Sequence, residues 1–162
     1  MMSTELPIVK KITWAYIVPQ LFLLFLLTLF FWKAFLPTSF SMAAAYSAVV
    51  YLLYSFGSKS LLLRYHREGI HLSKLQAFRE AIDKFQRSYG FLEKHPWLDK
   101  YRFITMLDSS ALSYREMALV NIAYSHLQLD EKATALKYYQ RALQEFPESE
   151  MAQSGIEYVA SK

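Results

Sequence analysis

The sequence predicts an all-α protein in which two transmembrane helices precede an array of helical hairpins, and three observations lead to this prediction. The chain has 162 residues, of which 54% are apolar and only 20% are charged. Two long uncharged runs stand near its beginning. After them, apolar residues recur at spacings of three and four, and no stretch alternates as a strand would. We therefore expect an N-terminal transmembrane hairpin over residues 1–58 and a helical domain over residues 59–162.

The first uncharged run lies between Lys11 and Lys33. A helix rises ~1.5 Å per residue, so a helix of this length crosses the ~30 Å hydrocarbon core of a bilayer. The run is too long for the apolar region of a cleaved signal peptide, and the small residues that could form a cleavage site come too late. We predict a retained membrane span at about residues 12–33.

The second uncharged run lies between Lys33 and Lys59, and Pro37 marks the break between the two runs. We predict a second span at about residues 38–57, joined to the first by a very short turn. Small residues stand four apart in this span, a spacing that lets two helices approach closely. We expect this face to form the hairpin contact, and the alternative is a seam between two copies of the chain. The pairs are Ser41 with Ala45 and Ala44 with Ala48.

Basic residues flank the hairpin unevenly. Lys10 and Lys11 precede it and a basic cluster follows it, whereas the turn holds only Lys33. Because Lys and Arg concentrate in cytoplasmic loops, we expect both termini in the cytoplasm and the hairpin in a bacterial inner membrane. The first residues of the cluster are predicted to face anionic lipid headgroups, with an ordinary stop-transfer flank as the alternative. They are Lys59, Arg64 and Arg67.

Stop signals divide the helical domain into segments. Pro96, Asp108, Asp130 and Pro147 each stand where an apolar stripe ends. Ser113, followed three residues later by Glu116, has the spacing of a capping box that opens a helix. We expect helices at about residues 60–74, 76–94, 97–108, 112–129, 132–146 and 149–160.

Two of the predicted hairpins share a spacing of small and aromatic residues. The later one carries Ala123, Ala135, Tyr139, Ala142 and Pro147. The earlier one carries Gly69, Ala81, Phe85 and Ser88 at the same intervals, with Glu93 in the proline position. This pattern resembles the tetratricopeptide repeat, in which small residues allow close helix crossing and an aromatic ring fills the gap between repeats.

The resemblance covers the domain with one departure. An extra segment, Pro96 to Arg115, separates the two repeats, and its apolar residues are expected to pack between or across them. The last segment, Ser149 to Ser161, resembles the solvating helix that ends such arrays.

The resemblance also implies a function. In this family the first helix of each hairpin lines a concave groove that receives a segment of a partner protein. Members that clamp a terminal carboxylate use Lys and Asn where this chain has Val120 and Tyr124, so we do not expect that ligand. The alternative is a groove that the helix containing Trp97 covers. By position, the groove residues are Met117, Val120, Tyr124, Leu127 and Gln128 of the later repeat, and Leu63, His66, Ile70, Ser73 and Lys74 of the earlier one.

Catalytic and cofactor chemistry finds little support in the sequence. The chain has no cysteine, and its four glycines are too far apart to form a phosphate-binding loop. His66 and His71 stand five apart and would point to different helix faces, so we expect solvated side chains and no metal site. His95 is expected at a helix end, and His126 is expected to be partly buried. We assign no catalytic residue, metal or cofactor.

The number and placement of charges argue against two further classes of protein. A net charge of +4 is too small for a nucleic-acid-binding surface. Neither uncharged run contains Asp, Glu, Lys, Arg or His, which disfavours a transporter. The prediction is a non-catalytic, membrane-anchored adaptor that binds a protein partner and membrane lipid. The alternative is a small integral subunit of a larger membrane complex, in which the hairpin makes the essential contacts.

Overall fold

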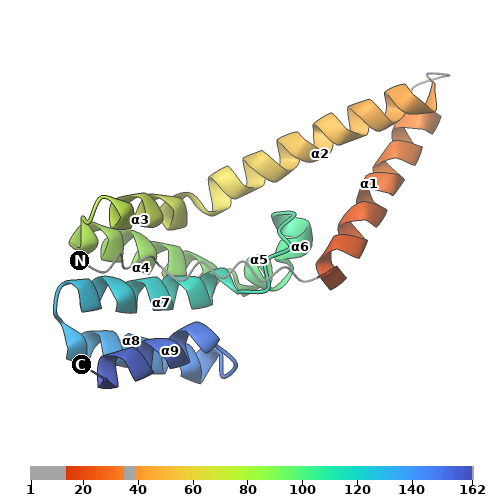
Figure 1. Cartoon of the computed structure of the whole chain (residues 1–162). Helices are drawn as coiled ribbons and strands as arrows, with labels where there is room; N and C mark the ends of the chain where they lie inside the picture. Colours follow the sequence, from red (N-terminus) through yellow and green to blue (C-terminus); the bar gives the residue numbers. More distant parts are fainter. Residues whose placement is uncertain (1–13, 35–38, 162) are drawn as a thin grey trace.

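The computed structural model describes residues 14–34 and 39–161, which form nine helices and no strand (Figure 1). The predicted all-α fold class is confirmed. A pair of long helices projects from a layered group of shorter ones. The helices are α1 (Trp14–Ala34), α2 (Phe40–Leu62), α3 (Arg64–Lys74), α4 (Phe78–Lys94), α5 (Pro96–Lys100), α6 (Arg102–Thr105), α7 (Tyr114–Gln128), α8 (Lys132–Glu145) and α9 (Glu150–Ala160).

Helices α1 and α2 are the two predicted spans. They contain 21 and 23 residues, and an 18-residue stretch within each has a mean hydropathy of 2.0 and 1.3, respectively, so both could cross a membrane by length and composition. Helix α2 continues past the predicted end at residue 57 to Leu62. Ser58, Lys59 and Ser60 end the apolar run, but none of them is a proline that would stop the helix.

The contact between α1 and α2 uses small side chains on a different face from the predicted one. Thr28, Ala43 and Ser47 are buried in it. The Ser47 hydroxyl donates to the Ala43 carbonyl at 2.7 Å, so burial leaves it satisfied within its own helix. The predicted pair of Ser41 and Ala45 is wrong, and the pair of Ala44 and Ala48 lies one position away from the buried pair, which starts at residue 43; one position along a helix turns a side chain by about 100°. Ser41 and Ala45 are exposed, and Ala44 and Ala48 are half-buried.

Leu63 interrupts the helix predicted from residue 60 to 74. The first part of that segment ends α2, and the second part is α3. Leu63 is buried against Leu92, Leu98 and Met106, which belong to the segment from α4 to the residue after α6. The chain therefore bends where a large apolar side chain turns into the core.

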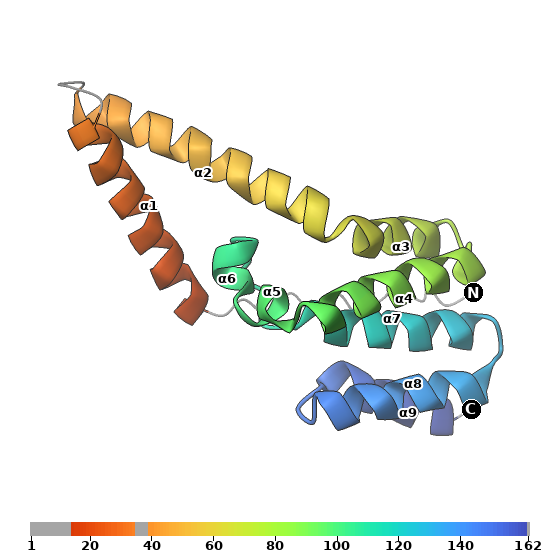
Figure 2. The ribbon, with the colours of Figure 1, turned by 180° about the vertical axis from the view of Figure 1, so that it is seen from behind.

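The shorter helices form two antiparallel hairpins, α3–α4 and α7–α8, that lie side by side in the order α3, α4, α7, α8, with α9 against α8 (Figures 1 and 2). Small residues lie where they cross. A Cβ added to Gly69 would stand 2.7 Å from the Phe85 ring, and one added to Gly155 would meet the Tyr139 ring. The residues of the predicted spacing are buried, except Pro147, which is exposed after α8: Gly69, Ala81, Phe85, Ser88, Ala123, Ala135, Tyr139 and Ala142.

The turns of the two hairpins have the same backbone geometry. Gln76 and Asp130 both have φ of 60°. In each turn the next residue donates its N–H to a carbonyl five residues back, from Ala77 to Leu72 at 3.0 Å and from Glu131 to His126 at 2.9 Å. This is the Schellman ending of a helix. The two hairpins thus match in the backbone geometry of their turns as well as in the spacing of their side chains.

The extra segment packs against the hairpins only at their ends, where Leu98 and Met106 are buried with Leu92 of α4 and partly buried Tyr114 of α7. The helix predicted at 97–108 is two short helices, α5 and α6, that meet at Tyr101. Helix α6 lies at the base of the α1–α2 hairpin: the Phe103 ring stacks on Tyr16 at 5.2 Å, and the Tyr54 hydroxyl of α2 donates to the Thr105 carbonyl at 3.2 Å. Helix α7 instead packs against α3, α4, α8 and α9. The segment that contains Trp97 therefore does not cover the groove face of α7, which was the alternative to an open groove.

Candidate functional site

The structure divides the predicted groove residues into two groups. Leu63, His66, Ser73 and Val120 are buried, so the prediction that they face a partner is wrong. Val120 joins the core cluster that contains Ala118 and Leu119. The others retain exposed surface on α3 and α7: Ile70, Lys74, Met117, Tyr124, Leu127 and Gln128.

His66 lies in the core between two aromatic rings, and the expectation of a solvated side chain is wrong for it. Its ring centroid is 5.6 Å from that of Phe85 and 5.4 Å from that of Tyr114. Burial lowers the pKa of His66 to about 4, against a smaller opposing effect of Asp99. The imidazole is neutral at pH 7. His66, Gly69 and Ser73 are three and four apart and all buried, so helical spacing carried a signal for this position.

The remaining histidines lie as expected. His71 is exposed, and the Nδ1 atom of His95 is 3.0 Å from the Phe91 carbonyl at the end of α4. His126 is partly buried: it stacks on Tyr138 at 5.4 Å, and its Nδ1 lies 2.6 Å from Glu131 Oε2. Within the described ranges no cluster of three or more His, Asp and Glu side chains could hold a metal ion.

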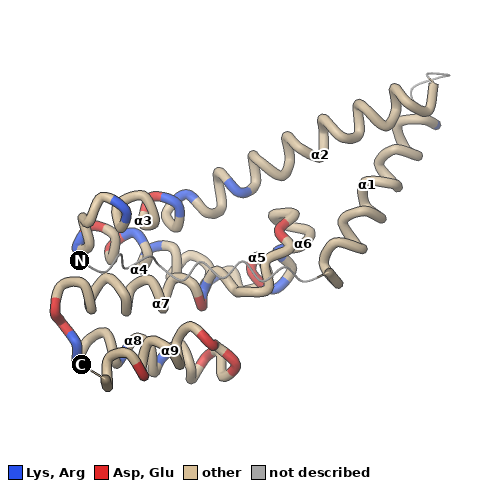
Figure 3. Tube along the Cα trace, in the orientation of Figure 1, with Lys and Arg blue, Asp and Glu red and all other residues tan. Residues whose placement is uncertain are grey.

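The basic residues predicted to face lipid lie where α2 meets α3 (Figure 3). Arg64 and Arg67 are exposed, and Lys59 is half-buried. Arg64 Nε is 3.8 Å from Glu68 Oε1, with both side chains well exposed, so this pair adds little stability. The cationic groups therefore stand at the base of the apolar hairpin.

Asp99 organises the start of α7, a role that the sequence did not reveal. Its carboxylate accepts hydrogen bonds from the N–H of Tyr114 at 3.0 Å and of Arg115 at 3.1 Å, and from the Ser113 hydroxyl. Ser113 Oγ in turn accepts from the N–H of Glu116 at 3.4 Å, which confirms the serine half of the predicted capping box. Asp99 lies in the extra segment, so only the fold brings it to this helix.

Arg102 holds the loop before α7. Its guanidinium donates to the carbonyls of Asp99 at 3.0 Å, Ser110 at 3.0 Å and Ala111 at 2.9 Å. The same group lies 5.3 Å from the ring centroid of Tyr16 in α1. Arg102 thus connects the first long helix, the extra segment and the loop.

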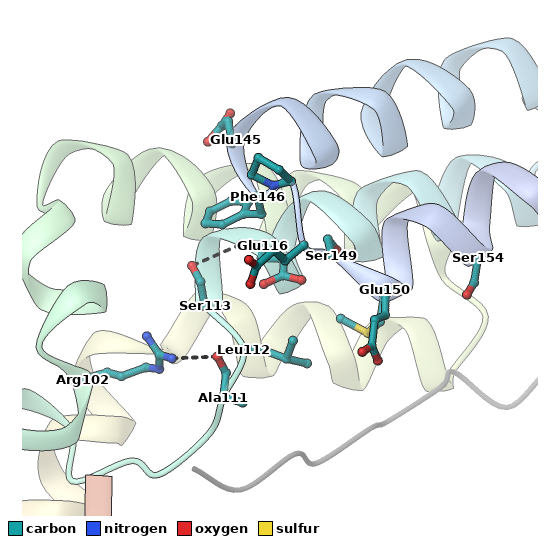
Figure 4. A pocket seen from close by; sticks show the side chains of 13 residues that line it. Arg102, Ala111, Leu112, Ser113, Glu116, Glu145, Phe146, Ser149, Glu150 and Ser154 are labelled. Carbon is teal, nitrogen blue, oxygen red and sulfur yellow. Dashed lines mark hydrogen bonds between the residues drawn. The ribbon is translucent and has the colours of Figure 1, made fainter. Parts of the chain in front are cut away.

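A pocket of about 750 Å³ opens beside this loop, between the start of α7 and the turn from α8 to α9 (Figure 4). Sequence spacing gave no sign of it, because its walls come from separate helices. Apolar, hydroxyl and acidic side chains line it together with Arg102. They include Leu112, Phe146 and Met151; Ser113, Ser149 and Ser154; and Glu116, Glu145, Glu148 and Glu150.

One wall of the pocket is braced by an ion-pair network. Arg115 Nη2 lies 2.6 Å from Glu145 Oε2, and the Tyr89 hydroxyl donates to Glu145 Oε1 at 2.7 Å. Arg141 Nε also donates to Glu145 Oε1, at 3.1 Å. The network joins α4, α7 and α8, and both oxygens of the Glu145 carboxylate have a partner in it.

Comparisons of the chain with family models, curated proteins and solved structures gave no match. A function for the chain must therefore be inferred from its own residues and their geometry.

Proposed function

We propose that the chain is a membrane-anchored, non-catalytic adaptor. In this proposal α1 and α2 span a bilayer, and the helical domain binds a segment of a partner protein at the membrane surface. The observation that carries the proposal is the outward-facing apolar surface of the two long helices.

Large apolar side chains cover the outside of this hairpin. Trp14 of α1 is 78% exposed, and Leu53 and Phe56 of α2 are 69% and 73% exposed. Soluble monomers rarely expose contiguous apolar surface on this scale, because each Å² left in water forgoes about 25 cal/mol of burial free energy. Lipid chains would remove this cost.

The helical domain supports the partner-binding half of the proposal. The two hairpins share close contacts between a small residue and a ring, and they share the geometry of their turns. These features are consistent with the resemblance to tetratricopeptide repeats, whose first helices receive partner segments. The surface that remains for a partner contains Met117, Tyr124, Leu127 and Gln128 of α7, with Ile70 and Lys74 of α3.

The distribution of charge supports a cytoplasmic domain. Basic residues gather at the base of α2 and along α3, whereas the tip of the hairpin carries only Lys33 among the described residues (Figure 3). We propose a bacterial inner membrane with the tip on the outer side.

The topology can be tested with single cysteines, because the chain has none of its own. Lys33→Cys should react with a membrane-impermeant maleimide in intact spheroplasts, and Glu157→Cys of α9 should react only after permeabilisation. Labelling of both sites in intact cells, or release of the chain by alkaline carbonate, would contradict the proposal.

Partner binding can be tested by affinity purification of the full chain in mild detergent. Tyr124→Asp places a charge on the α7 surface and should reduce the captured partner at least about tenfold, the effect of ~1.4 kcal/mol. Gln140→Asp, on an exposed position of α8, is the matched control and should keep the partner. Equal capture by both variants would exclude the α7 surface.

A second candidate function is that of a small integral subunit of a larger membrane complex. Ser41 and Ala45 favour it, because they stand four apart on α2 and are exposed. On this alternative Ala45→Leu would remove the partner in the same purification, and Tyr124→Asp would retain it.

A further inference from the structure

Glu116 is buried in the wall of the pocket between α7 and α9. Its side chain is among the most buried charged groups of the domain, with 6% of the residue exposed. Its Oε1 atom has no hydrogen-bond partner in the described part of the chain. In Figure 4 it lies between Ser113 and Ser149, from the starts of α7 and α9. A buried carboxylate oxygen without a partner is costly, so this position calls for a ligand.

Several donors near Glu116 are already used. Arg102 donates to three backbone carbonyls of the loop. The N–H groups of Tyr114 and Arg115 donate to Asp99, and the N–H of Ala152 in α9 donates to Ser149 Oγ at 3.3 Å. An anion entering the pocket would find carboxylates and no vacant donor among these groups.

The rest of the lining favours a long cationic side chain. Glu148 adds negative charge to the lining of the pocket, whereas Glu145 is neutralised by Arg115 and Arg141. Leu112, Phe146 and Met151 supply apolar walls on which methylene groups could pack. The volume of about 750 Å³ falls within the ~300–1,000 Å³ of ligand pockets and leaves room for a side chain with its flanking residues.

We propose that this pocket binds an arginine or lysine side chain of a partner segment, with Glu116 as the acceptor of its charged N–H group. The inference rests on the proposed adaptor function, because the basic residue belongs to the partner. The bond is a charge-assisted hydrogen bond, the stronger class of polar contact. The pocket would thus select, among segments that bind the α7 surface, those that carry a basic residue over neutral or acidic ones.

The test uses the full chain in detergent micelles and a short fluorescent peptide of alternating arginine and leucine. The comparison peptide has citrulline, which is neutral and of nearly the same shape, in place of arginine. Fluorescence anisotropy should show the arginine peptide binding at least about tenfold more tightly, the ratio expected of one hydrogen bond to a charged group. Glu116→Gln should abolish this preference, and Glu157→Gln, at an exposed position of α9, should keep it.

Thermal unfolding separates a lost site from a lost fold. Glu116→Gln should melt at the same temperature as the wild-type chain or higher, because it removes a buried charge that has no partner within the described chain. Equal affinity for the two peptides, or an arginine preference that survives Glu116→Gln, would overturn the proposal. If the preference for the arginine peptide appeared only in the double variant Lys10→Ala, Lys11→Ala, the natural occupant of the pocket would be the chain's own basic pair. This result would also overturn the proposal that a partner supplies the basic side chain.

The two proposals fail separately. A chain that captures a partner through α7 but does not prefer arginine would refute the pocket and leave the adaptor function standing. A chain that prefers arginine through Glu116 but captures no partner from membranes would refute the adaptor function.

Discussion

Acidification should destabilise the helical domain through His66. The residue is 3% exposed, and its pKa of about 4 lies below the ordinary value of 6.5. As pH falls below 6.5 the unfolded chain takes up the proton first, so the free energy of unfolding decreases until the pH reaches the folded pKa. The linkage relation gives a loss of about 2 kcal/mol between pH 7 and pH 5, and about 3 kcal/mol at pH 4.

The assay is urea unfolding of the full chain in detergent, followed by circular dichroism at pH 7 and pH 5. Carboxylates also titrate in this range, so the comparison is with His66→Phe, which keeps an aromatic ring between Phe85 and Tyr114. The wild-type chain should lose about 2 kcal/mol more than His66→Phe on going to pH 5.

His71→Gln is the matched control, because His71 is an exposed histidine on the same helix. It should show the pH dependence of the wild-type chain. If His66→Phe and the wild-type chain lost equal stability between pH 7 and pH 5, the buried neutral imidazole would be refuted as the cause.

Three further predictions concern packing and capping. Gly69→Ala should lower the free energy of unfolding in urea by about 1–3 kcal/mol, because the new Cβ would stand 2.7 Å from the Phe85 ring. The control is Gly90→Ala, whose Cβ meets nothing within 4 Å and which should raise that free energy by about 1 kcal/mol. Asp99→Ala should cost about 1–3 kcal/mol in the same assay, because the Tyr114 N–H loses its acceptor and the Arg115 N–H keeps only Ser113 Oγ, and an unchanged midpoint would exclude this capping role. Ala43→Leu should lower the resistance of the hairpin to unfolding by sodium dodecyl sulfate by about 1–3 kcal/mol, while the exposed Ala45→Leu should not.

Periodic and repeated features were predictable from the sequence. The uncharged runs indicated α1 and α2, and the shared spacing from Gly69 and Ala123 indicated residues that the structure buries at helix crossings. Both signals depend on residues close in the chain. They describe the faces of single helices well, but the face of α2 that meets α1 was misassigned by one position, because several small residues compete in that helix.

Features that depend on distant residues were not predictable. The apolar stripe of the extra segment suggested one helix, whereas Arg102 turns inward to bind the carbonyls of Ser110 and Ala111. Asp99 caps a helix that begins fifteen residues later in the chain, and no local pattern announces that bond. The pocket requires Glu116 and Ser149 to lie near each other, which only the stacking of the hairpins achieves.

Helix α6 belongs to the helical domain in the sequence, but in the structure it packs against the α1–α2 hairpin. In the sequence, a cut after residue 58 separates the apolar hairpin from the helical domain, yet Phe103 and Thr105 contact Tyr16 and Tyr54 in the two helices of the hairpin. Removing the hairpin would uncover these residues and leave Leu63 at a chain end. If the hairpin spans a bilayer, the contacts of α6 with both long helices, rather than the length of a linker, would set the height and tilt of the domain above the lipid.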